Sequence, residues 1–263
     1  MYPLIYIFSY PVYTFWIFLS LSFIVFLLML KKLSKKNNFS LSIFINNILW
    51  YILSIFFFSR LFYVISRFND LKYIDNFSDF FATTDYNFSL FWAIIGFWIV
   101  FFINLKLRGE RAIKYIDSVV LAFLLALVVW EIGALLWWQV YWKPTDLWIE
   151  ITYTNSFSPI SSTPVFPLPI VYIILFFIEF AFLYILSMYI KVKWFIAYIG
   201  LILFSLTIII FENFSWRTDI FNNYVLLNMN QILAFILMVF SFYRLYVLSK
   251  IWAKDTTVIL EHK

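Results

Sequence analysis

Four charged residues inside long apolar runs are the first candidates for chemistry in this chain. They are Arg60 in the run 41–64, Glu131 in 116–141, Glu179 in 169–190 and Glu212 at the end of 194–212. Charged side chains in a membrane span are costly and usually face the interior of a helix bundle. Two interpretations therefore stay open: a site that binds a polar headgroup, or structural pairs that hold helices together.

Arg60 lies late in the second apolar run and Glu212 at the end of the sixth, so both are predicted to approach the same side of the membrane. The two side chains are therefore expected to be able to form an ion pair. Glu131 competes for the same arginine. Glu179 is expected to favour the neutral form, because desolvation disfavours a carboxylate.

Several kinds of chemistry lack the residues that they need. The chain has no cysteine, and its one histidine is His262, next to the C-terminal residue. Four glycines, spread over the chain, form no phosphate-binding loop. No His, Cys and Asp cluster has metal-ligand spacing. We therefore predict no metal site, no cofactor, no disulfide and no Ser-His nucleophile.

The composition predicts the protein class that must position these residues. Hydrophobic residues make up 65% of the 263 residues, aromatic residues 25% and charged residues 13%. A soluble domain of this size has no interior large enough for that much apolar surface. The first ten residues carry no basic group and do not resemble a cleaved signal peptide. We predict an integral membrane protein with a single transmembrane domain, residues 1–263.

Seven apolar runs are long enough to cross a bilayer as helices, which need about 20 residues. The predicted spans are 12–30, 41–64, 88–105, 116–141, 169–190, 194–212 and 225–248. The predicted fold class is therefore an all-α membrane protein with seven transmembrane helices and small outer loops between the fourth and fifth.

Most of the 19 Lys and Arg residues border alternate ends of these spans. They cluster near 31–36, 106–114, 191–193 and 244–263, whereas the opposite loops carry Asp70, Asp75, Asp79 and Asp85. The positive-inside rule then predicts an outer N-terminus and an inner C-terminus. The net charge of +5 reflects this topology and contact with anionic lipid, so nucleic-acid binding is not expected.

Five short motifs occur in an order that resembles the bacterial prolipoprotein diacylglyceryl transferase family. Lys143-Pro144-Thr145-Asp146-Leu147 follows the fourth predicted span, where the family often has the same five residues. The other matches are Ser59-Arg60-Leu61 with Tyr63-Val64, Phe88-Ser89 with Ala93-Ile94-Ile95-Gly96, Pro164-Val165-Phe166-Pro167, and Leu227-Asn228-Met229-Asn230-Gln231-Ile232-Leu233.

This resemblance implies a fold, a reaction and a location. Family members transfer a diacylglyceryl group from phosphatidylglycerol to the cysteine thiol of a lipoprotein precursor. They do so at the outer side of the bacterial cytoplasmic membrane, and they have seven transmembrane helices with the N-terminus outside. The reaction needs groups that hold the phosphate and that help to form a thiolate.

The chain departs from the family at positions that the resemblance assigns to this chemistry. The family's third-span histidine falls on Phe91, its fourth-span arginine on Glu131, and its sixth-span arginine on Ile208. Further family polar or glycine positions fall on Trp92, Ala134, Trp137, Trp138, Gln139, Trp142 and Phe166. Large aromatic rings fill the space that glycine leaves open, and Glu131 repels a phosphate.

Arg60, Pro144, Asp146, Glu212 and Gln231 remain as in the family. We therefore predict a family member without transfer activity that binds phospholipid or a membrane partner protein. Its predicted polar cluster, either lipid-binding or structural, contains Arg60, Glu131, Asp146, Glu212 and Gln231.

Two alternatives stay open. The first is an active phosphatidylglycerol–prolipoprotein diacylglyceryl transferase with altered site residues, and the second is an unrelated transporter or sensor. The aromatic residues at 137–148 also have a simpler explanation, since Trp and Tyr are common at membrane interfaces.

Overall fold

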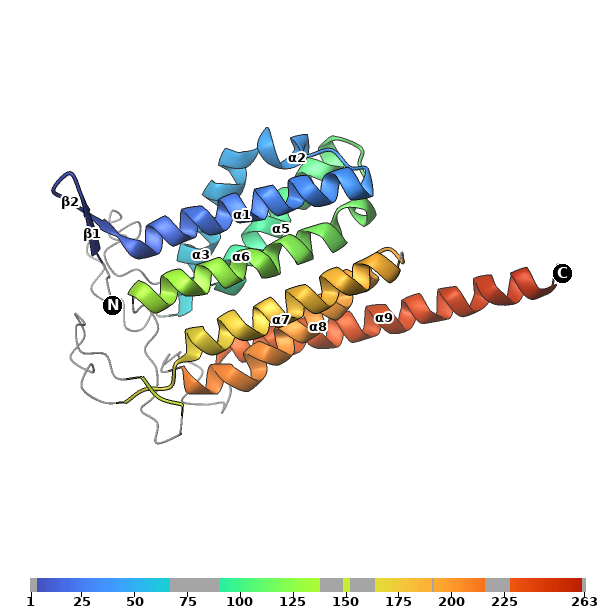
Figure 1. Cartoon of the computed structure of the whole chain (residues 1–263). Helices are drawn as coiled ribbons and strands as arrows, with labels where there is room; N and C mark the ends of the chain where they lie inside the picture. Colours follow the sequence, from blue (N-terminus) through green and yellow to red (C-terminus); the bar gives the residue numbers. More distant parts are fainter. Residues whose placement is uncertain are drawn as a thin grey trace.

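The computed structural model describes residues 4–66, 90–137, 149–151, 164–190, 192–215 and 228–261. These residues form a bundle of long helices that run roughly side by side, with a small β-hairpin at one end (Figure 1). The strands are β1 (Leu4–Ile7) and β2 (Tyr10–Tyr13). The helices are α1 (Thr14–Asn37), α2 (Ser42–Ile45), α3 (Ile48–Ser66), α5 (Leu90–Leu107), α6 (Ile116–Trp137), α7 (Leu168–Tyr189), α8 (Phe195–Phe211) and α9 (Met229–Glu261), with 3₁₀ turns at Ala112–Lys114 and Glu212–Phe214.

Five helices in the described residues are long and apolar enough to cross a membrane, namely α1, α6, α7, α8 and α9. The apolar segments Ile48–Leu61 of α3 and Phe91–Leu107 of α5 are shorter. These seven helices correspond to the seven predicted spans. The multi-pass helical architecture is therefore confirmed, whereas the orientation in the membrane stays a prediction.

The last predicted span, 225–248, agrees with the apolar part of α9, Met229–Lys250, although the helix itself continues to Glu261. Two other predicted spans were partly wrong. Residues 12 and 13 belong to β2 rather than to the first helix. The predicted span 41–64 is two helices, because α2 ends at its C-cap Asn46. The Nδ2 atom of Asn47 donates to the Ile43 carbonyl oxygen at 3.1 Å, a local bond by which asparagine interrupts helical pairing.

The hairpin precedes α1 directly. Leu4 pairs with Tyr13, and Ile7 pairs with Tyr10. The turn residues Phe8 and Ser9 have positive φ angles of 48° and 70°, as two-residue hairpin turns require. We call this end of the bundle the hairpin end. The opposite end, where α1 finishes with Lys35 and Lys36, is called the basic end.

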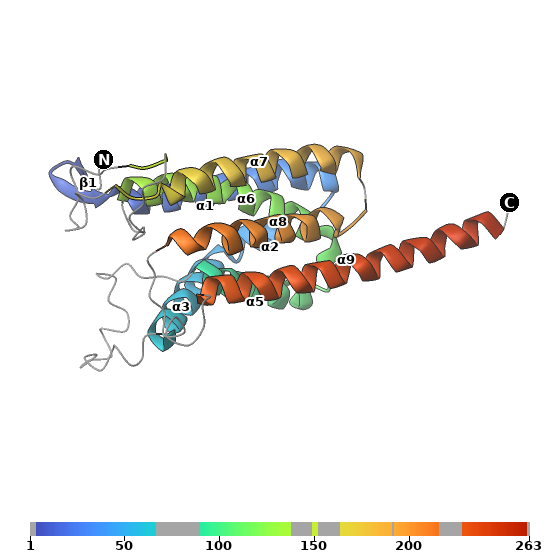
Figure 2. The same ribbon diagram turned by 90° about the horizontal axis from the view of Figure 1, so that it is seen from below.

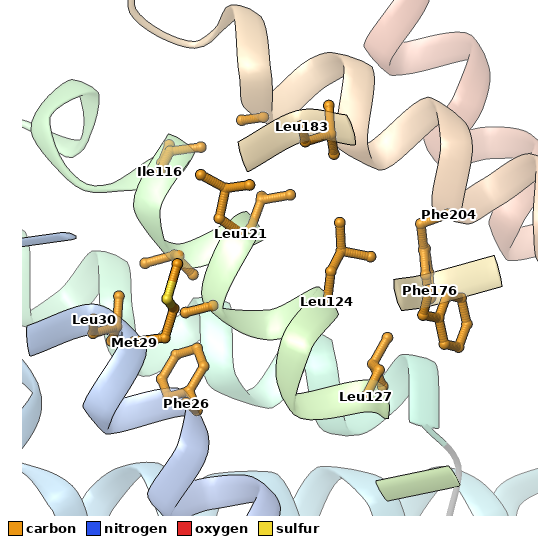
Figure 3. Close-up of a cluster of buried hydrophobic side chains, with 14 of the residues drawn as sticks. Phe26, Met29, Leu30, Ile116, Leu121, Leu124, Leu127, Phe176, Leu183 and Phe204 are labelled. Atoms are coloured by element: carbon orange, nitrogen blue, oxygen red, sulfur yellow. The ribbon is translucent and has the colours of Figure 1, made fainter. Parts of the chain in front are cut away.

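Helix α6 is the centre of the bundle, since it packs against α1, α7 and α8. Figure 3 shows its side chains Leu121, Leu124 and Leu127 between residues of these neighbours. Leu30 of α1 and Leu183 of α7 are fully buried beside them. Burial of leucine side chains against three helices fixes the position of α6, which carries Glu131.

Helices α7, α8 and α9 complete the bundle, with α8 packed against both α7 and α9. Helix α9 extends past the ends of the other helices at the basic end (Figures 1 and 2). There Arg244 of α9 donates from Nε to the Tyr198 hydroxyl of α8 at 3.1 Å. The start of α8 is also held by α6, because Asp117 accepts from the backbone N–H groups of Trp194 at 2.9 Å and Ala197 at 2.8 Å.

Gly96 of α5 lies close to the backbone of α3. A Cβ atom on Gly96 would lie 2.7 Å from the carbonyl oxygen of Ser54, while Ser54 Oγ donates to the Gly96 carbonyl at 2.8 Å. Small residues allow such close approach of helices in membranes.

Gly96→Ala is therefore expected to lower the unfolding free energy by about 1–3 kcal/mol, because the backbone must shift. Thermal unfolding of the detergent-solubilised protein measures this loss. Gly109→Asn is the control, since a Cβ there meets nothing within 4 Å and asparagine tolerates its φ of 65°. Equal stability of both variants would show that the α3–α5 contact is looser than described.

Candidate functional site

Glu212 is the centre of a buried polar cluster at the hairpin end. It begins the 3₁₀ turn that follows α8, and its side chain is only 6% exposed. Tyr172 Oη of α7 donates to Glu212 at 3.1 Å, and Asn230 Nδ2 of α9 donates to it at 2.7 Å. Glu212 thus joins three helices through neutral donors.

Gln231 extends this cluster along α9. Its Nε2 atom donates to the Ile209 carbonyl and to Asn213 Oδ1, both at 2.9 Å. Gln231 Oε1 also accepts from the Asn228 N–H at 3.1 Å, while Asn228 Oδ1 accepts from the Gln231 N–H at 3.0 Å. This reciprocal arrangement is a capping box, which begins α9 at a defined residue.

Two of the predicted site residues therefore lie together, namely Glu212 and Gln231. Sequence reasoning missed their partners Tyr172, Asn213, Asn228 and Asn230. The spacing Asn228-x-x-Gln231 is the pattern of a capping box and could have indicated the start of α9. Tyr172 gave no such signal, because tyrosine is abundant in this chain.

Arg60 of α3 and Glu131 of α6 are both buried, each with 7% of the side chain exposed. The predicted pairing of Arg60 with Glu212, Glu131 or Asp146 stays a prediction. Asp146 lies outside the described residues, together with the rest of the Lys143–Leu147 motif and with Trp138, Gln139 and Trp142.

The positions that the resemblance matches to family histidines hold buried aromatic rings. Phe91 of α5 lies against Phe204 of α8, with ring centroids 5.9 Å apart. Phe166 stacks on Phe214 at 4.1 Å. Ile208, matched to a family arginine, is 4% exposed. These side chains can neither carry a proton nor bind a phosphate.

Glu179 is separate from the Glu212 cluster. It lies two helical turns further along α7 than Tyr172, and its Oε1 atom accepts from Thr207 Oγ1 of α8 at 2.5 Å. Its Oε2 atom is buried, with no hydrogen-bond partner among the described residues. Glu179 thus links α7 to α8 within the bundle.

An apolar cavity of about 160 Å³ lies among α1, α3, α5, α6, α8 and α9. Its walls include Phe26 of α1, Ile94 of α5, Trp130 of α6, Phe204 of α8 and Leu237 of α9. Ser22 also borders it, but its hydroxyl donates to the Leu19 carbonyl at 2.7 Å. The cavity suits hydrocarbon and offers no binding partner to a charged group.

In the ranges that the structure describes, no group of three or more His, Cys, Asp or Glu side chains has the geometry of a metal site. The polar residues that are present offer hydrogen bonds and buried charges. Among the described residues they form a framework of carboxylate, amide and hydroxyl groups joined by hydrogen bonds.

Comparison with known proteins completes the description of the site. No curated protein sequence matches the chain. The family model of prolipoprotein diacylglyceryl transferase matches residues 3–247, which include every described helix from α1 to most of α9. The chain therefore belongs to the prolipoprotein diacylglyceryl transferase family.

Proposed function

We propose that this protein is a membrane component of the family that binds phospholipid or a membrane partner protein without transferring a diacylglyceryl group. The family uses phosphatidylglycerol as its lipid substrate, and phosphatidylglycerol is accordingly the phospholipid that we expect. The proposed location is the bacterial cytoplasmic membrane, which is typical of the family.

The observation that carries this proposal is the aromatic packing at the matched positions. Phe91 contacts Phe204, and Phe166 contacts Phe214, so apolar rings occupy the sites at which the family has histidine. A phosphate ester needs cationic or hydrogen-bonding groups around it during transfer. Neither pair of rings supplies one.

The charge of Glu131 supports the same conclusion. A carboxylate at a position matched to a family arginine repels the phosphate of the lipid donor, and in a buried setting this repulsion amounts to several kcal/mol. The retained groups Glu212 and Gln231 are engaged with Tyr172, Asn230 and Asn213. These contacts support a structural role for the retained residues.

Rescue of bacterial cells depleted of their own diacylglyceryl transferase tests the proposal in vivo. We expect no growth when this chain is expressed, and normal growth when an active family enzyme is expressed from the same vector. Membrane levels of both proteins are compared through a common epitope tag. Growth at matched levels would support the alternative of an active enzyme with altered residues.

A further inference from the structure

Two lysines of α1 converge on one tyrosine of α7 at the basic end. Lys32 Nζ lies 5.1 Å from the centroid of the Tyr184 ring, and Lys36 Nζ lies 5.5 Å from it. The lysines are four residues apart, so they share one face of α1. Helices α1 and α7 both pack against α6, which lies between them (Figure 1).

This convergence concentrates positive charge at one ring. In the part of the chain that the structure describes, no Asp or Glu lies within ion-pair distance of Lys32 or Lys36. The acidic residues near this end have other partners. Asp117 accepts from the N–H groups of Trp194 and Ala197, and Glu110 accepts from the Tyr115 hydroxyl.

The Tyr184 ring attracts each ammonium group through its quadrupole, but it carries no net charge. Two like charges at one ring repel each other, and an anion between or beside them removes that repulsion. The ring is only partly buried, and it also stacks on Phe180. Lys32 and Lys36 are themselves exposed, so the pair of lysines is accessible to a ligand.

The position along the helices indicates which anion fits. Lys32, Lys36 and Tyr184 all lie in the last two turns of helices that are long and apolar enough to span a membrane. Tyrosine and lysine favour the interface at which phospholipid phosphates lie. Basic groups between helices at this level bind anionic headgroups.

We propose that Lys32, Lys36 and Tyr184 form a binding site for the phosphate of an anionic phospholipid headgroup at the basic end. The two ammonium groups bind the phosphate oxygens, and the Tyr184 ring holds both lysines on one side of α1. Tyr184 lies twelve residues after Tyr172 on α7, which is about 18 Å along the helix. The site is thus distinct from the Glu212 cluster at the hairpin end.

The test compares two double variants of the whole chain with equal charge changes. Lys32→Gln/Lys36→Gln removes both proposed ligands, and Lys31→Gln/Lys35→Gln removes two neighbouring lysines of the same helix. Each protein is purified in neutral detergent and titrated with phosphatidylglycerol. Native mass spectrometry counts the bound lipids, with phosphatidylcholine as the neutral comparison.

We expect the Lys32/Lys36 variant to bind phosphatidylglycerol about 30-fold more weakly at one site, given the usual contribution of a lysine near a lipid surface. The control variant is expected to lose less than about threefold. Equal losses in both variants would overturn the proposal, because they would indicate diffuse attraction to anionic lipid. Melting temperatures in lipid-free detergent confirm that both variants fold.

Two further measurements distinguish a lipid headgroup from free phosphate, and the lysine site from the residues at the hairpin end. Inorganic phosphate at the same concentrations is expected not to displace phosphatidylglycerol, and displacement would overturn the assignment to a lipid. The loss in Lys32→Gln/Lys36→Gln should be the same in an Arg60→Ala background. If the proposed function is wrong, the expected loss of lipid binding in Lys32→Gln/Lys36→Gln is therefore unaffected.

Discussion

Purified protein, incubated with phosphatidylglycerol and a lipobox peptide, is expected to yield lipidated peptide at less than about one-thousandth of the rate of an active family enzyme. General acid–base catalysis contributes about 10²–10⁴ in rate, and one electrostatic donor about 10²–10³. Phe91 and Ile208 replace groups that the resemblance assigns to such roles. The two contributions together amount to at least about 10⁴, which exceeds the expected deficit.

Mass spectrometry of the peptide measures the transfer, with an active family enzyme in the same detergent and lipid as the positive control. Glu212→Gln is the matched variant, because Glu212 is a glutamate that the resemblance matches to the family. Peptide that is lipidated by the unmodified chain but not by Glu212→Gln would refute our proposal. Product in a mock purification from cells that lack this chain would identify a contaminating enzyme.

Replacement of Arg60 by alanine is expected to lower the unfolding free energy by about 3–5 kcal/mol, the usual cost of leaving a buried charge without its partner. Arg60 is 7% exposed, so its guanidinium requires compensation within the protein. We predict that Glu212, Glu131 or Asp146 supplies it. Differential scanning fluorimetry of the detergent-solubilised variants gives the stability change.

Double variants then identify the partner. Arg60→Ala combined with removal of the true partner should recover part of the loss, whereas a combination with a distant carboxylate should add to it. Glu131→Gln is the most informative second change, since Glu212 also holds Tyr172 and Asn230. A different outcome would follow if Arg60 binds a headgroup: Arg60→Ala would reduce co-purified phosphatidylglycerol and leave the melting temperature in lipid-free detergent unchanged.

The helices could be predicted from the sequence because apolar runs of sufficient length have few alternatives in a bilayer. The break at Asn46 and Asn47 could not, since two amides in an apolar run also fit an unbroken helix. The hairpin was missed for a related reason. Tyr10, Val12 and Tyr13 are apolar or aromatic, so composition alone merges β2 with α1.

The candidate site was predictable in part. Charge inside a span pointed to Arg60, Glu131, Glu179 and Glu212, and all four are buried. The neutral partners could not be predicted, because Thr207, Tyr172 and Asn230 become significant only when α7, α8 and α9 lie next to one another. Hydrogen bonds across helices depend on rotation and register, and a single sequence carries little information about either.

The central position of α6 has a consequence for biosynthesis. Helix α1 begins at Thr14, but α6, its main neighbour, begins only at Ile116, about 100 residues later. At synthesis rates of roughly 5–20 residues per second, the first span waits about 5–20 s for its partner. During that time the exposed faces of α1 must be covered by lipid or by the insertion machinery. The contact between α1 and α6 can therefore form only after the fourth span has emerged, later than the contact between α3 and α5.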